Sequence, residues 1–289
     1  MKTIALRDPE YSQLLRQIPD PPPVLYVEGA LLKEDGAAVA IVGTRAATAY
    51  GLSIARRLGQ ELARCGITVV SGLAEGIDAA AHEGALEERG RTLAVLGHGL
   101  SRIYPACHKG LADRIVRSGA LISEFPWEAE PTPWNFPKRN RIISGLSLGV
   151  VVVEAPLKSG ALITARQAME QGREVFAVPG PISAIQSRGT HQLLRDGARL
   201  VESAQDILEE LAPQLKGQLG AWGKTEGLNQ GFSAEEQEVW EAVPAGKGVL
   251  FEEVAQAAEM APSKILAVLT QLELKGAIRQ TPGRGYSRR

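Results

Sequence analysis

The segment from Ala37 to Arg45 has the sequence AAVAIVGTR, an unbroken apolar run that ends in a glycine turn. An apolar run without alternating polar residues is typical of a strand that is buried on both faces of a parallel sheet. A helical pattern follows immediately, from Thr48 to about Cys65. Strand, glycine turn and helix in direct succession therefore predict the first unit of an α/β fold.

The same unit recurs further along the chain, as short apolar strands with helices between them. The further predicted strands are Ile67–Val70, Thr92–Leu96, Ala120–Ser123, Val150–Val153, Val175–Val178 and a last one at Ala198–Val201. The further predicted helices cover Asp78–Glu88, about Cys107–Arg117, Leu162–Gln171 and a final segment through Leu211. This alternation predicts the fold class as α/β, with a doubly wound, Rossmann-like parallel sheet.

Composition divides the chain into an arm, a main domain, a linker and a small C-terminal domain. The arm covers residues 1–35 and contains a proline-rich break followed by a short strand candidate at Val24–Val27, and the main Rossmann-like domain covers residues 36–212. Residues 213–231 contain several glycines and no apolar periodicity, which indicates a flexible linker. Residues 232–289 are predicted to form the small domain.

The small domain is predicted to contain three helices followed by a β-hairpin, which is the pattern of a winged helix. A capping box at Ser233–Glu236 begins the first helix, the second covers Phe251–Met260, and Pro262 begins the third. The hairpin is expected between Ile278 and Tyr286. Because the third helix is only weakly basic, contact with a protein is as good an interpretation as reading of a DNA groove.

Composition argues against a membrane-spanning protein. Of the 289 residues, 44% are hydrophobic and 22% are charged, and no apolar run is long enough to span a bilayer. The first residues lack the apolar core of a signal peptide, and Cys65 and Cys107 lack the spacing of a zinc site. We therefore expect a cytoplasmic protein without a bound metal. The formal net charge of −1 means that any nucleic-acid binding must come from a local basic patch.

The segment Phe136–Gly145, FPKRNRIISG, is the strongest candidate for such a patch. Because Pro137 fits only the first turn of a helix, Lys138, Arg139 and Arg141 are expected at the positive end of that helix. Free backbone N–H groups at a helix start are a natural site for phosphate. Arg139 is predicted to lie above the apolar stripe of the helix, and the other two cations beside it. The alternative is a solvated helix start with surface ion pairs.

Other candidate residues lie where the predicted strands end. Ligands of open α/β sheets bind outside the carboxyl ends of the strands. Those ends carry Gly43-Thr44-Arg45, Ser71-Gly72, Gly97-His98-Gly99, Glu154 and Ser159-Gly160. The basic helix start is expected at the same edge of the sheet, so Arg45 is predicted to lie beside Lys138, Arg139 and Arg141.

Two common nucleotide-binding motifs are missing. In place of the GxGxxG motif of a dinucleotide site, the chain has Arg45 at the second glycine position, and Ser71 stands where an acidic residue would bind a ribose. Lys158-Ser159-Gly160 lacks the preceding glycine loop of a nucleoside triphosphatase. We therefore expect no nucleotide cofactor. Arg45 is instead predicted to bind an external phosphate, with capping of a loop by an ion pair as the alternative.

Titratable residues offer weaker candidates for catalysis. Asp78 and His82 are four residues apart on one helix face, but helix capping by Asp78 and packing of His82 are the favoured roles. Glu154 ends a buried strand and is expected either to steer an acid/base step or to pair with the arginines, with pairing favoured. Phe136 is placed to stack on a nucleobase. An aromatic ring next to cations is typical of proteins that hold single-stranded nucleic acid.

Together these motifs resemble the DNA-processing protein A family, also called DprA or Smf, over roughly Pro23–Val201. Each motif is weak alone, but their order along the chain is highly specific. The matching motifs are Val42–Arg45 with Thr48, Tyr50 and Gly51; Ser71-Gly72 with Gly76–Asp78 and Ala81-His82; Gly97 with Tyr104-Pro105; Ser123–Pro126; Phe136-Pro137 with Arg139–Ile143; Glu154-Ala155 with Ser159–Ala165; and Gly172–Gly180.

The resemblance implies an extended Rossmann domain that binds single-stranded DNA without strong sequence preference and without catalysis. It also implies loading of the RecA recombinase onto that DNA in natural transformation, and a homodimer formed through the Rossmann domain. A winged-helix tail occurs in many members. The predicted DNA-binding residues are Gly43, Thr44, Arg45, Phe136, Lys138, Arg139, Asn140, Arg141, Lys158, Ser159 and Gly160.

Two other functions compete with this interpretation. A Rossmann-like phosphoribohydrolase, which releases bases from nucleoside monophosphates, would carry paired glycines and a following glutamate, and the segment Lys158–Thr164 has neither. A transcription regulator led by the winged helix is a third, weaker hypothesis.

Glu75 departs from the family, which often has a basic or neutral residue at this position. If it faces the pocket, its negative charge would weaken the positive field there.

Overall fold

The computed structural model describes residues 2–218 and, beyond them, 234–244, 248–258, 260, 264, 265, 268, 269, 272, 277–281 and 285–288. The chain divides into two compact units, residues 1–220 and residues 221–289. Each unit has its own hydrophobic core and is described separately below.

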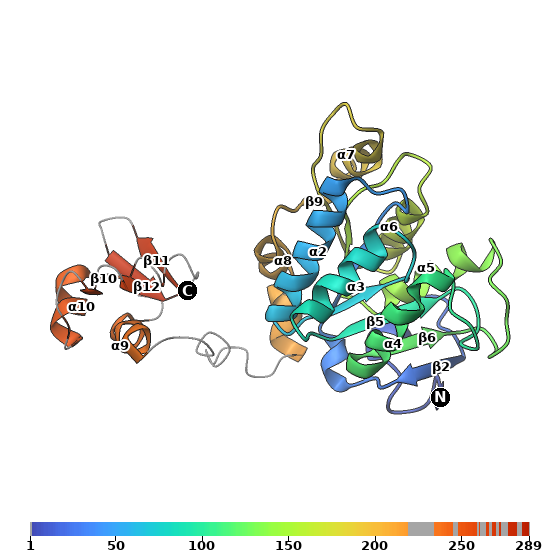
Figure 1. Ribbon diagram of the computed structural model, residues 1–289, viewed down its shortest axis with the longest axis horizontal. Helices are drawn as coiled ribbons and strands as arrows, with labels where there is room; N and C mark the ends of the chain where they lie inside the picture. The colour runs from blue at the N-terminus through green and yellow to red at the C-terminus, as the bar shows by residue number, and fades with distance from the viewer. Residues whose placement is uncertain are drawn as a thin grey trace. The chain divides into compact units, whose positions relative to one another are not determined.

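The larger unit is built on a nine-stranded sheet with the order β1-β2-β6-β5-β4-β3-β7-β8-β9 (Figure 1). The strands are β1 Lys2–Ala5, β2 Val24–Gly29, β3 Ala38–Val42, β4 Thr68–Ser71, β5 Thr92–Leu96, β6 Ala120–Ser123, β7 Gly149–Val152, β8 Glu174–Ala177 and β9 Arg199–Leu200. In this spatial order, each pair of neighbouring strands between β6 and β9 is parallel. β2 pairs with β6, and β1 with β2, in antiparallel register.

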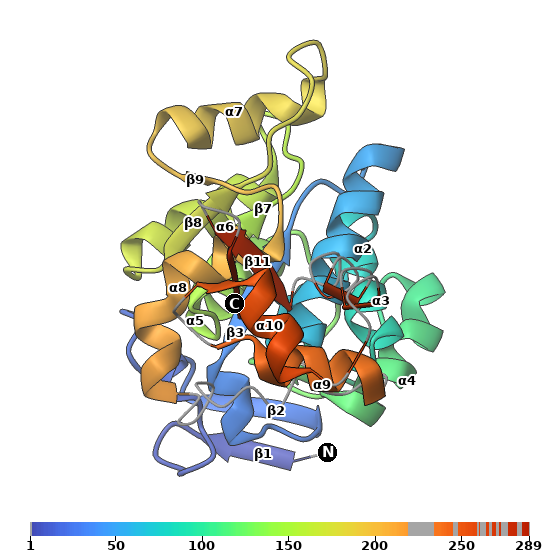
Figure 2. The same ribbon diagram turned by 90° about the vertical axis from the view of Figure 1, so that its left-hand side faces the viewer.

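Helices connect the strands and cover both faces of this sheet (Figure 2). They are α1 Gln13–Arg16, α2 Ala49–Arg64, α3 Ile77–Glu87, α4 Lys109–Ser118, α5 Asn135–Gly145, α6 Gly160–Glu170, α7 Arg188–Arg195 and α8 Ala204–Gln218, with short 3-10 turns at Lys33–Gly36, Ala106–His108 and Ile185–Ser187. Apolar residues of α5, α6 and α7 form one core with Ala38, Ala40 and Val42 of β3. Those of α2, α3 and α8 form a second core with Val39 and Ile41. The predicted doubly wound sheet is therefore confirmed.

Two segments differ from the sequence-based prediction. The predicted arm is part of the sheet, because β1 and β2 extend its edge and Leu25 and Val27 are buried in the core. The predicted linker begins too early, since α8 continues through Pro213 to Gln218. Leu211 and Leu215, one helical turn apart, both pack into the core and offset the hydrogen bond that the proline cannot make.

The smaller unit has the elements of the predicted winged helix. These are α9 Ala234–Ala242, β10 Val249–Leu250, α10 Phe251–Ala257, β11 Ile278–Thr281 and β12 Gly285–Arg288. The sheet order is β10-β12-β11. Ile265, Leu269 and Leu272, which follow Pro262 in the predicted third helix, are buried in the core, and most of that predicted helix lies outside the described residues. The predicted capping residue Ser233 and the turn at 282–284 lie outside the described residues.

In the described part of the chain, no helix combines the length and the apolar composition needed to cross a membrane.

Two glycines allow the close approach of α2 and α3, which both begin near the carboxyl ends of the parallel strands. A Cβ on Gly59 would lie 2.5 Å from the Ala81 carbonyl oxygen, and a Cβ on Gly84 would collide with the Arg56 carbonyl oxygen. Both obstacles are backbone atoms, which cannot rotate away. The positions of the two helix starts therefore depend on residues without a side chain.

We expect Gly84→Ala to lower the free energy of unfolding by about 1–3 kcal/mol, because the methyl group forces the two helices apart. Gly110→Ala is the matched control, since Gly110 is also helical and a Cβ there meets nothing within 4 Å. That control should be neutral or stabilise the protein by about 0.4–1 kcal/mol. Urea denaturation of both variants measures the difference, and equal stabilities would contradict the packing argument.

Candidate functional site

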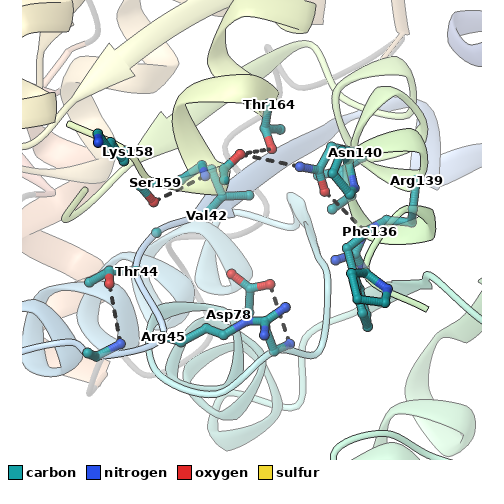
Figure 3. A pocket seen from close by; sticks show the side chains of 18 of the residues that line it. Val42, Thr44, Arg45, Asp78, Phe136, Arg139, Asn140, Lys158, Ser159 and Thr164 are labelled. Atoms are coloured by element: carbon teal, nitrogen blue, oxygen red, sulfur yellow. Dashed lines mark hydrogen bonds between the residues drawn. The ribbon is translucent and has the colours of Figure 1, made fainter. Parts of the chain in front are cut away.

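A pocket of about 660 Å³ opens at the carboxyl ends of β3 and β7. These strands are neighbours in the sheet, and the connections from them run in opposite directions, to β4 on one side and to β8 on the other. Such a switch point is where open α/β sheets bind ligands. The residues that line the pocket come from the turn after β3, from α3, from the loop after β5, from α5 with the loop before it, and from the start of α6 (Figure 3).

The turn after β3 is pressed between α3 and the end of β7. A Cβ on Gly43 would collide with Ile77 and lie 2.9 Å from the Glu154 carbonyl oxygen. The Thr44 amide donates to that same oxygen at 2.7 Å. The turn therefore has a fixed path, and it delivers the exposed side chain of Arg45 to the pocket. The Arg45 guanidinium carbon lies 5.2 Å from the centroid of the Phe136 ring, within the range of a cation–π contact.

Glu154 does not pair with an arginine, contrary to the sequence-based expectation. Its buried carboxylate accepts hydrogen bonds from the Thr48 amide at 2.9 Å and from the Thr48 hydroxyl at 2.6 Å. Thr48 is the N-cap of α2, so Glu154 supports the start of that helix. The expectation failed because the carboxylate accepts from the amide and the hydroxyl of Thr48, a residue that is distant from Glu154 in the sequence.

Arg139 is buried beneath the start of α5, with only 4% of its surface exposed. One terminal nitrogen, Nη1, donates to the carbonyl oxygen of Gly72 at 2.8 Å and to that of Val95. Burial lowers the Arg139 pKa to about 10, against the opposing effect of Asp78, so the side chain is still charged at neutral pH. Among the described residues, none accepts a hydrogen bond from the other terminal nitrogen, Nη2. A buried cation with a free donor thus lines the pocket.

Asp78 holds the loop between β4 and α3. It is buried, lies in the first turn of α3, and accepts hydrogen bonds from the amides of Gly72 at 3.1 Å and Ala74 at 3.4 Å. Burial raises the Asp78 pKa, and the Arg139 charge opposes that rise. One turn later, the buried His82 has its Nδ1 2.6 Å from the Thr92 hydroxyl. His82 thus has the packed role favoured for it, whereas the predicted capping role of Asp78 is wrong, because the N-cap of α3 is Gly76 and Asp78 accepts from amides of the loop before the helix.

Lys138 and Arg141 are matched by an internal carboxylate and do not line the pocket. Arg141 donates two hydrogen bonds to Glu124, at 2.7 and 2.8 Å, and its Nε donates to the carbonyl oxygen and to the carboxylate of Asp20, both at 3.0 Å. The Lys138 ammonium lies 3.6 Å from Glu124. The expectation that all three cations of this helix start face the crevice is therefore wrong for these two. The cause is Glu124, which directly follows β6 and is nearly buried.

The start of α6 forms the opposite wall of the pocket. Ser159 is the N-cap, and its side chain accepts a hydrogen bond from the Ala161 amide at 3.2 Å. Lys158 is exposed at the same wall. Asn140 of α5 donates to the Gly160 carbonyl oxygen at 3.3 Å and so ties the two helix starts together. Nine of the predicted residues line this single pocket: Gly43, Thr44, Arg45, Phe136, Arg139, Asn140, Lys158, Ser159 and Gly160.

Sequence reasoning placed Tyr104 in a motif shared with the family but did not assign it to the site, and it lines the pocket from the loop after β5. Its ring centroid is 6.0 Å from that of Phe136 and 6.4 Å from that of His98. The only signal in the sequence was its place in a Tyr-Pro pair after a glycine-ended strand. In the part of the chain that the structure describes, no group of three histidine, cysteine, aspartate or glutamate residues is placed to hold a metal ion.

The fold and the pocket define a two-domain protein, with a doubly wound α/β domain that bears a cation-lined pocket at its switch point and a winged-helix domain. Residues 2–212 match the family model for DNA recombination-mediator protein A, and residues 225–284 match that for the DprA winged helix domain. The chain belongs to this family, whose proteins are named DprA or Smf.

Relatives and solved structures agree with this assignment. The chain is 45% identical to Protein Smf of Escherichia coli, over 96% of this chain and 75% of that protein. It is 47% identical to DNA processing protein DprA of Bacillus subtilis, over 73% of this chain and 71% of that protein. The structure of DprA from Streptococcus pneumoniae superposes with a TM-score of 0.69 at 43% identity, covering 72% of this chain and 74% of that one.

A further structure is that of DNA processing protein A from Helicobacter pylori, which was determined to describe a unique single-stranded DNA binding mode of that protein. It superposes with a TM-score of 0.66 at 31% identity, and covers 74% of this chain and 97% of that one.

The buried His82 gives a pH-dependent prediction. Burial lowers its pKa from 6.5 to about 3, so between these values the unfolded chain binds a proton that the folded protein does not. The contribution of His82 to the free energy of unfolding has its full value above pH 6.5 and is lost as the pH falls toward 3. We expect the stability difference between wild type and His82→Asn to shrink by about 2 kcal/mol from pH 7 to pH 5 in urea denaturation. Parallel profiles over that range would contradict the assignment, and parallel profiles above pH 7 are the internal control.

Proposed function

We propose that this protein binds single-stranded DNA in the pocket at the switch point and acts as a non-enzymatic mediator of recombination. The observation that carries the proposal is the convergence of Arg45, Arg139 and Lys158 on one pocket from three different elements. The Helicobacter pylori relative, described for its single-stranded DNA binding mode, supports the same class of ligand. A net positive pocket on a protein with a formal charge of −1 is the local patch that nucleic-acid binding requires.

The cations of the pocket suit a phosphodiester backbone. Arg45 is exposed and carries its charge at the mouth, Arg139 offers a free donor from below, and the start of α6 adds backbone N–H groups beside Lys158. Such groups contact phosphates and do not read base edges. Binding is therefore expected to depend strongly on salt and weakly on sequence.

Two carboxylates near the pocket, Asp78 and Glu154, are committed to structural contacts, which supports binding without catalysis, whereas Glu75 lines the adjoining cavity with Arg45 and Tyr104. Among the described residues that line it, Asp78 is the one carboxylate, and it accepts hydrogen bonds from two backbone amides. Glu154 is occupied by Thr48. A phosphoribohydrolase would need a free acid near the scissile bond. Incubation with nucleoside monophosphates should accordingly release no free base.

The remaining parts of the proposal concern partners. We propose that the protein loads the RecA recombinase onto single-stranded DNA in the cytoplasm during natural transformation, in line with its membership of the DNA recombination-mediator family.

Lys138 and Arg141 support the proposed DNA binding indirectly, because their contacts with Glu124 and Asp20 fix the start of α5, which carries Phe136 and Arg139.

We also propose a homodimer formed through the Rossmann domain. β9 is an edge strand with both residues exposed, and an edge strand offers unpaired backbone groups to a second chain. Leu200 on this strand is 52% exposed, and Ile182 and Ile185 shortly before it are 91% and 61% exposed. Apolar side chains so exposed near a free edge suit a contact between copies.

Removal of Arg45 and Lys158 tests the pocket assignment. We expect the double variant Arg45→Ala, Lys158→Ala to bind oligo-dT at least roughly tenfold more weakly than wild type, because two contacts with phosphates are lost. The slope of log affinity against log salt should become shallower by roughly 1.4, since about 0.7 counterions are released per neutralised phosphate on a single strand. Fluorescence anisotropy over a salt series measures both quantities.

Arg114→Ala is the control for the loss of a cation, because Arg114 is exposed on α4 and does not line the pocket. Unchanged affinity and slope in the double variant would remove the pocket from the proposal. The same double variant should also fail to load RecA onto oligo-dT.

The dimer is tested at the sheet edge. Leu200→Glu places a charge on the proposed interface and should convert a dimer to a monomer in sedimentation velocity. Leu52→Glu is the control, because Leu52 is 40% exposed on α2 and is not part of the sheet edge. Loss of the dimer in the control alone would place the interface elsewhere.

A further inference from the structure

We propose that Tyr104 is the residue on which a nucleobase stacks when a DNA strand occupies the pocket, an inference that rests on the proposed function. Tyr104 lines both the pocket and a smaller cavity beside it, which are also shared by Arg45, Phe136 and Arg139. The tyrosine is 46% exposed although it contacts two other rings. A ring face is therefore open to a ligand beside the cations of the pocket.

Phe136, which the sequence favoured for stacking, already has neighbours around its ring. The Arg45 guanidinium lies over it, with 5.2 Å between the guanidinium carbon and the ring centroid. The ring also lies so close to Gly97 that a Cβ there would approach Phe136 Cδ1 to 2.8 Å. Tyr104 follows at 6.0 Å with a tilt of 39°. Phe136 thus supports Arg45 and Tyr104, and its own ring is not the free platform.

A base cannot enter between the two rings. A base inserted between two rings needs about 7 Å between the planes of those rings, because each of its two stacking contacts takes about 3.5 Å. The 6.0 Å between the centroids of Tyr104 and Phe136 is too short for that. The base must therefore stack on the outer face of Tyr104, where solvent now has access.

His98 holds Tyr104 in place for this contact. The two rings are nearly perpendicular, at 86°, with 6.4 Å between their centroids. His98 is buried, its Nδ1 lies 2.8 Å from the Gly99 carbonyl oxygen, and its own carbonyl accepts a hydrogen bond from the Ser123 hydroxyl at 2.6 Å. A ring that is fixed before binding loses little conformational entropy when a base stacks on it.

The arrangement assigns different parts of a nucleotide to different residues. Arg45 and Lys158 lie where phosphates would be neutralised, and Tyr104 lies at the same mouth with an aromatic face. Every base has a π-face, so stacking on Tyr104 adds affinity for any base-bearing strand without selecting a sequence. A strand without bases would gain nothing from this residue.

The test compares oligo-dT with an abasic oligomer of the same length and phosphate number, each measured by fluorescence anisotropy on the full chain. Tyr104→Ala should bind oligo-dT roughly 5- to 150-fold more weakly and leave the abasic affinity unchanged, because only the base contact is lost. Tyr104→Phe should stay within about twofold of wild type for both probes, since the ring is kept. Tyr50→Ala is the matched control, a tyrosine that is 42% exposed and does not line the pocket.

Thermal melting of each variant checks that it is folded, and photo-crosslinking of a 5-iodouracil-substituted strand to wild type, mapped by mass spectrometry, gives a second measurement. A crosslink at Tyr104 supports the proposal. Equal loss for both probes in Tyr104→Ala, or a loss confined to the base-bearing probe in Phe136→Ala but not in Tyr104→Ala, would overturn it. If wild type binds oligo-dT and Tyr104→Ala binds it equally well, this inference alone fails. If wild type binds neither probe, the proposed function fails and this inference falls with it.

Discussion

The site depends on one buried charge, the guanidinium of Arg139. Taking a cation out of water is costly, and here the cost is offset by the carbonyl oxygens that follow β4 and end β5, and by the nearby Asp78. These contacts join the start of α5 to the ends of two parallel strands. Because α5 carries Phe136 and Asn140 on the same turns, its attachment also fixes the aromatic and amide groups of the pocket.

Neighbouring cations on α5 have different surroundings because a helix turns by about 100° per residue. Arg139 faces the sheet, whereas Lys138 and Arg141 face Glu124 after β6, and Asp20 supplies a second negative charge to Arg141. The positive character of the pocket therefore comes only in part from this helix. Arg45 and Lys158, from the ends of β3 and β7, carry the rest, so the charge collects at the switch point of the sheet.

The fold could be predicted well because its signals are local. The central strands β3 to β7 are buried on both faces and appear as mostly apolar runs, and the apolar stripe of α5 correctly indicated the direction of Arg139. Contacts between distant segments left no such signal. Glu124 is distant in sequence from the cations that it contacts, so no local pattern pairs them. The helix through Pro213 is stabilised by the burial of Leu215, against the local tendency of proline to end a helix.

Tyr104 was missed for a related reason. An isolated tyrosine in a loop has no periodicity, and its importance arises only when the loop after β5 brings it against Phe136 and Arg45. Under the proposed function this placement favours a single strand over a duplex. Bases in a duplex are already stacked on their neighbours and must leave the stack to reach a fixed ring, at a cost of a few kcal/mol. In a single strand that cost is smaller, so a fixed aromatic face beside phosphate-binding cations selects the strand without reading its sequence.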